Sequence, residues 1–269
     1  MTTITVLKSV LQGKCALITG STQGLGLAAA KRFAAAGCNI VINGFGDERE
    51  IAAMRAQIEK EHGVRTTYSN ANLANASEIE RMMAVSLEAF GAIDILVNNA
   101  VVRYAAPVEQ FPVGEWDLGI AVNISAAFHT IRLALPAMRR RNWGRIINVS
   151  SIYGLIGGVN RLSYVTSKTA LIGMTRAIAL ETRGHDITCN AVCPGTVETP
   201  VHLATIEQMM AAESLSHAEA ETRFLANKQP GGRFIGAEDV AGMLLFLCGP
   251  ESRDITGAAL PIDGGWSIS

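Results

Sequence analysis

The sequence lacks an excess of charge of either sign, since its 269 residues contain 23 Lys and Arg against 24 Asp and Glu, a formal net charge of -1. Proteins that bind nucleic acid or anionic membranes through a basic stripe normally show such an excess. We therefore expect a small-molecule substrate, with no nucleic acid and no membrane among the partners. The 49% of hydrophobic residues provide enough apolar surface for a large core, which excludes a disordered chain.

Paired cysteines and long apolar runs are also missing. The five cysteines are an odd number without a C-x-x-C pair, which predicts free thiols and a reducing compartment. The longest apolar run, Met243 to Cys248, is far too short to cross a bilayer, and the first ten residues contain no apolar block of signal-peptide length. These absences predict a cytoplasmic protein. Because the five histidines have neither metal-ligand spacing nor a paired carboxylate, we also predict no catalytic metal.

The sequence does contain a regular alternation of short apolar runs with longer helical patterns. Strands are expected at 16–18, 39–43, 65–69, 93–97, 145–149, 187–192 and 260–262. Helices are expected at 25–36, around 51–58, from a capping box at Ser77 to Glu80 as far as 90, and at 116–140, 164–182 and 238–247. This order predicts an α/β fold of the Rossmann type, a doubly wound parallel sheet of about seven strands with helices on both faces. We expect a single domain over residues 1–269, with a helical insertion at about 197–228 that we interpret as a substrate lid.

A glycine-rich turn, TGSTQGLG at residues 19–26, joins the first strand to the first helix. Glycine permits a sharp turn and a close approach to a pyrophosphate, and the helix N-terminus offers free N–H groups and partial positive charge. The turn therefore predicts a dinucleotide site, with a purely structural turn as the alternative. The second strand ends in NGFGD at 43–47, without the usual acid for an adenosine ribose. Because Asp47 would repel a 2'-phosphate, NAD is favoured over NADP.

Polar residues with a possible chemical role are expected at the carboxyl edge of the sheet. Tyr164 and Lys168 share one face of a predicted helix, and a neighbouring ammonium lowers the pKa of a phenol from about 10 toward a value useful for proton transfer. Ser151 and Asn98 follow or end strands at that edge, and Asn123 is an unfavourable residue inside a helix unless its amide has a partner. A Tyr–Lys pair alone is common on exposed helices, but this convergence favours an active site.

Along essentially its whole length, the sequence resembles the short-chain dehydrogenase/reductase family. The resemblance rests on the glycine turn at 19–26, NNA at 98–100, the Asn, Ser, Tyr and Lys just described, Pro194-Gly195 and DGGW at 263–266. It implies that Tyr164 is the general acid/base, that Ser151 orients the reacting oxygen, that Lys168 lowers the pKa of Tyr164 and holds the nicotinamide ribose, and that Asn123 supports a proton relay through water. The cofactor-binding residues that it implies are Gly20, Thr22, Gln23, Gly24, Leu25, Gly26, Phe45, Asn72, Leu73, Asn98, Ala100, Tyr164, Lys168, Pro194, Gly195, Val197 and Thr199.

Within that family, NGFGD, Phe111-Pro112 and Lys228-Gln229-Pro230 resemble the bacterial D-3-hydroxybutyrate dehydrogenases, which use NAD without the ribose-binding acid. Where those enzymes have Gln, His, Lys and Trp around a small carboxylate, this sequence has Arg103, Tyr153, Arg161 and Thr196. Arg161 keeps a cation that can bind a carboxylate in bidentate fashion, and loss of the Trp enlarges the pocket. The resemblance thus implies a larger or cyclic secondary alcohol or ketone, with His202 in the lid as a further substrate contact.

Two departures from the family pattern carry expectations of their own. Val101 replaces the usual glycine after NNA, which predicts a displaced turn because a β-branched residue disfavours positive φ. Asn72 replaces the usual aspartate, which predicts weakened contacts to adenine.

The implied function is that of an oxidoreductase that transfers a hydride between NAD(H) and a secondary alcohol or its ketone. Two alternatives stay open, an NADPH-dependent ketoreductase of the 3-oxoacyl type and a dinucleotide-binding protein without turnover. Because family members usually form tetramers through two long helices, here 116–140 and 164–182, the resemblance also implies a homotetramer.

Overall fold

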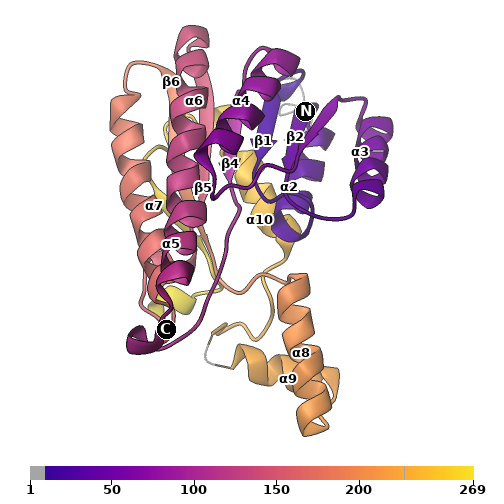
Figure 1. The fold of residues 1–269 in the computed structure, drawn as a ribbon, viewed down its shortest axis with the longest axis vertical. Coiled ribbons are helices and arrows are strands. Elements are labelled where there is room, and N and C mark those ends of the chain that lie inside the picture. The colour runs from indigo at the N-terminus through magenta and orange to yellow at the C-terminus, as the bar shows by residue number, and fades with distance from the viewer. Residues whose placement is uncertain (1–9, 227) are drawn as a thin grey trace.

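A parallel sheet of seven strands organises the chain in the computed structural model, which describes residues 10–226 and 228–269 (Figure 1). The strands lie in the order β3-β2-β1-β4-β5-β6-β7, which confirms the predicted doubly wound fold. Their bounds are β1 Cys15–Ile18, β2 Asn39–Asn43, β3 Thr66–Ser69, β4 Ile95–Asn98, β5 Trp143–Val149, β6 Asp186–Pro194 and β7 Ala259–Ile262. The chain crosses from edge strand β3 to β4 beside β1, which places the switch in winding direction between β1 and β4.

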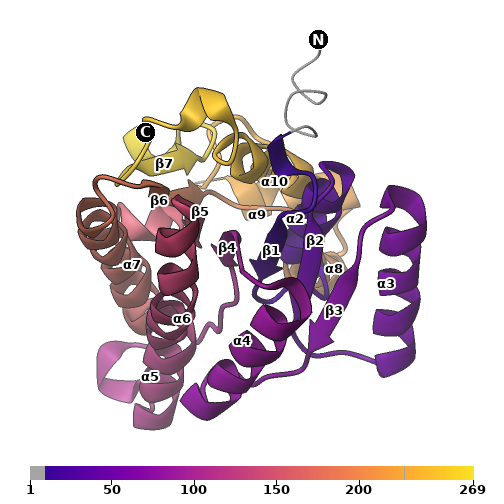
Figure 2. The same ribbon diagram turned by 90° about the horizontal axis from the view of Figure 1, so that it is seen from above.

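Helices cover both faces of the sheet (Figure 2). One face carries α2 (Gly24–Ala35), α3 (Glu48–His62) and α10 (Ala237–Phe246), and the other carries α4 (Ala76–Phe90), α6 (Ala126–Arg141) and α7 (Leu162–Glu181). Successive strand residues point to opposite faces, so Ile18 packs in the core beneath α2 whereas Leu17 packs in the core beneath α4 and α6. The apolar strands are thus buried on both sides, as parallel sheets require.

The starts of two predicted helices differ from the structure in an informative way. Helix α4 begins at Ala76 and is capped by Asn75, whose side-chain oxygen accepts from the N–H of Ser77 at 3.0 Å. The predicted capping box at Ser77 to Glu80 was therefore wrong, because Asn caps as well as Ser and lies two residues earlier. The long helix expected at 116–140 begins at Val113 instead, and runs through α5 (Val113–Ile120), a π-helical turn η2 (Ala121–Ser125) and α6.

This continuous helix, Val113–Arg141, is long and apolar enough to cross a membrane by length and composition. The sequence expectation had weighed only the shorter run at 243–248. In the structure, Ile131, Ala134 and Met138 of the helix are buried in the core cluster against the sheet. The helix is therefore part of a layer of the fold, a position in which core helices commonly have this composition.

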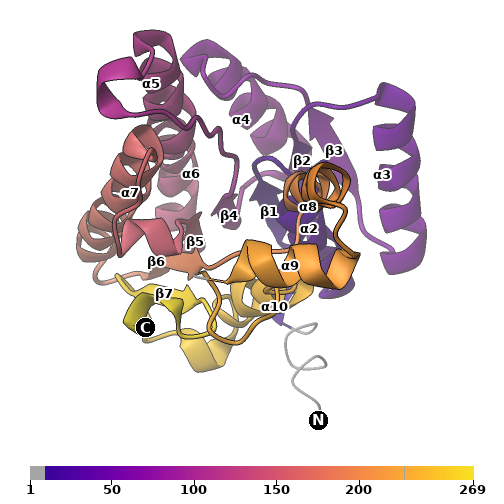
Figure 3. The ribbon, with the colours of Figure 1, turned by 90° about the horizontal axis from the view of Figure 1, so that it is seen from below.

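The insertion after β6 forms two helices, α8 (Pro200–Glu213) and α9 (His217–Leu225), which project beyond the carboxyl end of the strands (Figures 1 and 3). Together with Phe234 they form a small apolar cluster, which includes Ile206 and Leu225 and is separate from the clusters around the sheet. The insertion is helical over most of the predicted span of 197–228, in which Asn227 lies outside the described residues.

Candidate active site

The carboxyl ends of β1 and β4 are joined by a network around Thr19. The Thr19 hydroxyl accepts from the N–H groups of Asn99 at 2.9 Å and Ala100 at 3.0 Å. In return, the Asn99 amide donates to the carbonyl groups of Thr19 at 2.9 Å and Gly20 at 3.0 Å. These bonds fix the glycine turn against the NNA segment at the topological switch, the position where open α/β sheets bind ligands.

The glycine turn has the backbone geometry that the sequence predicted. Gly20 and Gly24 have φ of +63° and +53°, a region that favours glycine. A Cβ on Gly26 would lie only 2.1 Å from the carbonyl oxygen of Gly20, so the helix approaches the turn too closely for any side chain. Gln23 precedes α2 without a side-chain capping bond, which leaves N–H groups of the first helical turn available for an anion.

Thr199 provides an independent test of whether a dinucleotide fits here. Its hydroxyl oxygen is buried without a hydrogen-bond partner among the described residues, and such orphaned groups are rare in folded proteins. A Cβ built on Gly24 would lie 3.9 Å from the Thr199 methyl group and 4.0 Å from Pro200, so the N-termini of α2 and α8 are adjacent. Two helix N-termini and an unpaired hydroxyl fit a pyrophosphate.

The polar side chains at and just after the end of β2 already have hydrogen-bond partners within the protein. The Asn43 amide is buried and donates to the carbonyl groups of Ser69 at 3.2 Å and Ala71 at 3.1 Å. The Asp47 carboxylate accepts from the first N–H groups of α3, so it acts as a helix cap. Sequence reasoning assigned Asp47 only a repulsive role and missed the cap, which an Asp just before a helical pattern would have indicated. Phe45 lies between them with its side chain 65% exposed.

Tyr164 and Lys168 lie in the first turns of α7 and are both buried. The Lys168 ammonium donates to the carbonyl of Val149 at 2.7 Å and lies 5.7 Å from the centre of the Tyr164 ring. Ser151 follows β5, caps the short helix η3 (Ile152–Gly154) through the N–H of Tyr153, and lies close enough to the Tyr164 phenol to lower its pKa. The structure thus brings together the Ser, Tyr and Lys that the sequence predicted.

Arg103 adds a second cation to the Tyr164 phenol. Its guanidinium carbon lies 5.2 Å from the ring centre. Burial by itself raises the pKa of Tyr164, but the charges of Arg103 and Lys168 and the hydrogen bond from Ser151 outweigh it and lower the pKa to about 8. At pH 7 the phenolate fraction then rises from about one in a thousand to about one in ten. The arrangement can therefore accept and return a proton near neutral pH.

The pKa of Lys168 is lowered to about 8, mainly because the ammonium is buried, while the neighbouring Tyr164 phenolate opposes the shift. The ammonium therefore stays mostly charged at pH 7. Because the Val149 carbonyl also fixes its position, Lys168 presents a stationary positive charge beneath the phenol.

Asn123 lies in the π-helical turn and holds the loop that carries Arg103. Its amide oxygen accepts from the N–H of Val102 at 2.8 Å, and its NH₂ group donates to the Val102 carbonyl at 3.0 Å and the Ser167 hydroxyl at 3.3 Å. The partner that sequence reasoning required for Asn123 is therefore this loop. Val101 is not among the described residues with positive φ, so the loop does not impose on it the conformation that a β-branched residue disfavours.

The predicted substrate residues come from the segments that follow β4, β5 and β6 and from α8. The Tyr153 ring packs edge-on against Tyr164 at 6.1 Å and Trp266 at 5.5 Å. Arg161 precedes α7, Thr196 is buried after β6, and His202 lies in α8 with its Nδ1 2.7 Å from the Val197 carbonyl. The sequence analysis did not identify the aromatic residues around them, although the Trp of the DGGW motif is one of these residues. These are Trp266 beside Tyr153, and Phe224 and Phe234 beside His202.

Other residues expected to bind the cofactor have their side chains inside the fold. Asn98 donates to the Asn148 amide oxygen at 2.9 Å and accepts from the Thr130 hydroxyl at 2.7 Å. Leu73 is buried in a core cluster. Asn72 is exposed, and its side-chain oxygen accepts from the N–H of Ala74 at 3.0 Å. Their roles toward a cofactor stay predictions.

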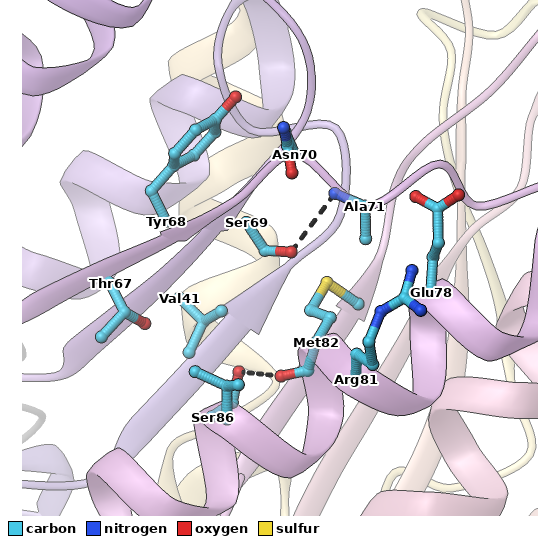
Figure 4. Close-up of a pocket in the computed structure, with 11 residues that line it drawn as sticks. Val41, Thr67, Tyr68, Ser69, Asn70, Ala71, Glu78, Arg81, Met82 and Ser86 are labelled. Carbon is cyan, nitrogen blue, oxygen red and sulfur yellow. Dashed lines mark hydrogen bonds between the residues drawn. The ribbon is translucent and has the colours of Figure 1, made fainter.

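A separate cavity of about 250 Å³ lies between β3 and α4 (Figure 4). Thr67, Ser69 and Arg81 are among its lining residues, and it contains none of the predicted site residues. Among the described residues, no group of three or more His, Cys, Asp and Glu side chains is placed to hold a metal ion.

Comparison with known proteins decides the family. The short chain dehydrogenase family matches residues 14–210 of this chain. The chain belongs to the short-chain dehydrogenase family. This short-chain dehydrogenase is 43% identical over 257 residues to the D-beta-hydroxybutyrate dehydrogenase of Cupriavidus necator, covering 96% of this chain and 99% of that one. It is 41% identical to the enzyme of the same name from Rhizobium meliloti over 94% and 98% of the two chains. It is therefore an oxidoreductase that acts on CH–OH groups.

Other relatives of the short-chain dehydrogenase have different substrates in their names. The 3-oxoacyl-[acyl-carrier-protein] reductase of Aquifex aeolicus is 33% identical over 95% of this chain and 98% of its own. The solved structure of an actinorhodin polyketide ketoreductase with NADPH superimposes with a TM-score of 0.86 at 32% identity, over 95% and 98% of the chains. The structure of L-sorbose reductase from Gluconobacter frateurii, with NADPH and L-sorbose, gives a TM-score of 0.92 at 27% identity over 96% and 98%.

Proposed function

We propose that this short-chain dehydrogenase uses NAD(H) to interconvert a secondary alcohol bearing a carboxylate and the corresponding ketone. The observation that carries the proposal is the buried Tyr164 side chain, whose ring centre lies 5.2 Å from the Arg103 guanidinium carbon and 5.7 Å from the Lys168 ammonium, with Ser151 close enough to affect the pKa of the phenol. The identity of 43% and 41% to two D-beta-hydroxybutyrate dehydrogenases supports a substrate related to 3-hydroxybutyrate.

Four residues carry the proposed proton chemistry. During alcohol oxidation, the Tyr164 phenolate takes the proton of the substrate hydroxyl, and during ketone reduction the phenol returns it. The Ser151 hydroxyl orients the reacting oxygen, and the Lys168 ammonium stabilises the phenolate and holds the nicotinamide ribose. Asn123 keeps the β4–α5 loop in place and supports a proton relay through water. A bound nicotinamide dinucleotide supplies the acceptor or donor of the hydride.

The proposed cofactor site combines the glycine turn with the start of α8. Gly26 lets α2 pack closely on the turn, the α2 N-terminus offers N–H groups to a pyrophosphate, and the Thr199 hydroxyl has a free hydrogen-bonding capacity there. We favour NAD because Asp47 keeps a carboxylate next to the end of β2, where a 2'-phosphate would meet like charge.

An NADPH-dependent ketoreductase is the second candidate function. It is favoured by the 33% identity to a 3-oxoacyl-[acyl-carrier-protein] reductase and by two similar structures solved with NADPH. Initial rates with NAD and NADP as alternative oxidants separate the two. We expect kcat/KM for NAD to be at least about 10-fold higher, since one like-charge contact disfavours binding by about 1.4 kcal/mol or more. A preference for NADP would favour the second candidate.

The proposed substrate pocket lies between α7 and the insertion. Arg161 is the proposed anchor of the substrate carboxylate, because a guanidinium binds a carboxylate through two parallel hydrogen bonds. Arg103, Tyr153, Thr196 and His202 form the rest of the pocket. Thr196 is small, which leaves room for a substrate larger than hydroxybutyrate, including a cyclic one. The helices α8 and α9 act in this proposal as a lid on a single-domain enzyme.

The proposed setting is the cytoplasm, as a homotetramer without nucleic acid or membrane partners. Five free and buried cysteines fit a reducing compartment. The helices α5, α6 and α7 would form the contacts between subunits.

The variant Tyr164→Phe, which lacks only the phenolic hydroxyl, tests the proposed function. We expect Tyr164→Phe to lower kcat for 3-hydroxybutyrate oxidation with NAD by about 10²- to 10⁴-fold, the usual contribution of a general acid/base. Tyr104→Phe is the matched control, because Tyr104 is a partly exposed tyrosine that packs on Phe111 and should leave kcat unchanged. Equal turnover by Tyr164→Phe and the unaltered enzyme would refute the proposal.

A further inference from the structure

The turn that follows β2 is held by hydroxyl groups from two other parts of the fold. The Thr22 hydroxyl, in the glycine turn, donates to the Phe45 carbonyl at 2.9 Å. The Tyr68 hydroxyl, on β3, donates to the Gly44 carbonyl at 3.0 Å. A Cβ built on Gly44 would lie 2.8 Å from the Thr22 hydroxyl oxygen, so glycine allows the two turns to approach this closely. The Thr22 hydroxyl therefore lies directly at the end of β2.

Both hydroxyl groups have their protons committed to backbone carbonyls. A hydroxyl has one proton and a carbonyl oxygen can only accept, so the direction of each hydrogen bond is fixed. The Tyr68 phenol keeps its proton at neutral pH, because burial and, after it, the negative charge of Glu48 raise its pKa. The oxygen of Thr22, a half-buried residue, can therefore accept a further hydrogen bond but has no second proton to donate.

A hydrogen-bond acceptor is what the end of β2 lacks in the sequence. In dinucleotide-binding folds, a carboxylate at this position accepts from the 2'-hydroxyl of the adenosine ribose. Here β2 ends in Asn43, whose buried amide donates to the carbonyl groups of Ser69 and Ala71. The Asp47 carboxylate accepts from the first N–H groups of α3. The side chains of both residues are thus already in use within the fold, whereas the Thr22 oxygen keeps a capacity to accept.

We propose that Thr22 takes the place of the missing acid and determines the preference for NAD over NADP. Its oxygen accepts a hydrogen bond from the 2'-hydroxyl of the adenosine ribose. A 2'-phosphate at pH 7 has mostly lost its second proton and its oxygen atoms only accept, so it finds no donor at Thr22. Tyr68 is a positioning residue, because it holds the carbonyl next to the one that takes the Thr22 proton. The inference rests on the proposed function and identifies the residue that selects the cofactor.

Removing a hydroxyl from either the protein or the cofactor tests this hydrogen bond. The probes are NAD, NADP and an NAD analogue whose adenosine ribose lacks the 2'-hydroxyl, with dissociation constants measured by calorimetric titration in the absence of substrate. We expect the unaltered protein to bind the analogue about 3- to 10-fold more weakly than NAD, the usual effect of one hydrogen bond. Thr22→Val should bind NAD and the analogue with equal affinity, and its affinity for NADP should be no lower than that of the unaltered protein.

Three further variants separate the hydroxyl from the shape of the turn. Thr22→Ser keeps a hydroxyl and should keep the difference between NAD and the analogue. Tyr68→Phe frees the Gly44 carbonyl but leaves Thr22 in place, so the difference should become smaller without disappearing. Thr67→Val is the matched control, because the Thr67 hydroxyl lines the separate cavity beside α4 (Figure 4) and has no partner among the described residues. It should bind all three cofactors as the unaltered protein does.

Equal affinities of the unaltered protein for NAD and the analogue, or an undiminished difference in Thr22→Val, would overturn the inference. So would a loss of NADP affinity in Thr22→Val that exceeds the loss of NAD affinity, since the hydroxyl would then act as a donor to the phosphate. An unchanged difference in Tyr68→Phe would refute its positioning role. These titrations need no proton transfer, so the proposed function is tested separately by the rate of Tyr164→Phe.

Discussion

At the residue scale, the main finding is that two cations act on the Tyr164 phenol. Lys168 is buried and fixed by the Val149 carbonyl, whereas Arg103 reaches the ring from an exposed position on a loop. The pKa of Tyr164 falls to about 8 despite burial, which by itself would raise it. Such a fall corresponds to roughly 3 kcal/mol in favour of the phenolate.

The pH dependence of alcohol oxidation tests the contribution of Arg103. Oxidation needs the phenolate, so kcat/KM should rise with pH up to about 8, the pKa of Tyr164. Removing a positive charge disfavours the phenolate, so Arg103→Gln should move the rising limb to higher pH, by about one pH unit or more. Measured pH profiles of kcat/KM check this, and the control Arg140→Gln, at an exposed arginine at the end of α6, should follow the profile of the unaltered enzyme. A limb that stays in place would show that Arg103 does not act on the phenol.

Sequence reasoning identified the reacting residues more easily than their electrostatic neighbours. The helical spacing of Tyr164 and Lys168 predicted a shared face, and the structure places them together. Arg103 was predicted only as a substrate contact, because no local pattern connects a loop after β4 with a helix 61 positions later in the chain. Its position depends on Asn123, which binds the Val102 backbone from a π-helical turn. Interactions of this kind depend on the tertiary fold and leave no periodic signal.

At the scale of elements, the turn between β1 and α2 is the most constrained part of the site. The alternation of apolar runs predicted this strand–turn–helix unit, because the spacing of apolar residues in a strand or helix depends only on that element. The contact between Gly26 and the Gly20 carbonyl is set by how closely the helix packs on the turn, which the glycine motif indicates. The exact helix starts were less predictable, since Asn75 caps α4 as well as a later Ser would, and α5 begins after Pro112 without a side-chain cap.

Adding one methyl group at Gly26 tests whether close packing in this turn is required. Gly26→Ala would place a Cβ 2.1 Å from the Gly20 carbonyl oxygen and 2.8 Å from the Asn99 amide nitrogen, so the backbone must shift. We expect a loss of about 1–3 kcal/mol in the free energy of unfolding, the usual cost of overpacking, and at least about 10-fold weaker NAD binding. Urea denaturation and NAD titration measure the two effects.

Gly242→Ala is the control for Gly26→Ala. Gly242 lies in α10, and nothing lies within 4 Å of the added Cβ. Because Ala favours a helix over Gly, this variant should be more stable by about 0.5–1 kcal/mol and should bind NAD normally. If both variants behaved alike, close packing at the turn would not be the cause.

At the scale of the whole molecule, exposed apolar residues lie on two of the helices through which we propose that copies of the chain associate. Phe128 on α6 is 52% exposed and Leu180 on α7 is 60% exposed. Both helices lie on the same face of the sheet (Figure 2). Large exposed side chains of this kind on neighbouring helices are typical of surfaces that become buried on association.

Light scattering of the purified protein tests the predicted homotetramer. We expect a mass about four times that of the 28.5 kDa chain. Phe128→Glu should lower the mass toward that of smaller species, because a buried and unpaired carboxylate disfavours an interface by several kcal/mol. Val85→Glu on α4 is the matched control, since Val85 is 59% exposed but lies outside the helices predicted to associate. A monomeric mass for the unaltered chain, or an unchanged mass for Phe128→Glu, would contradict association through this face.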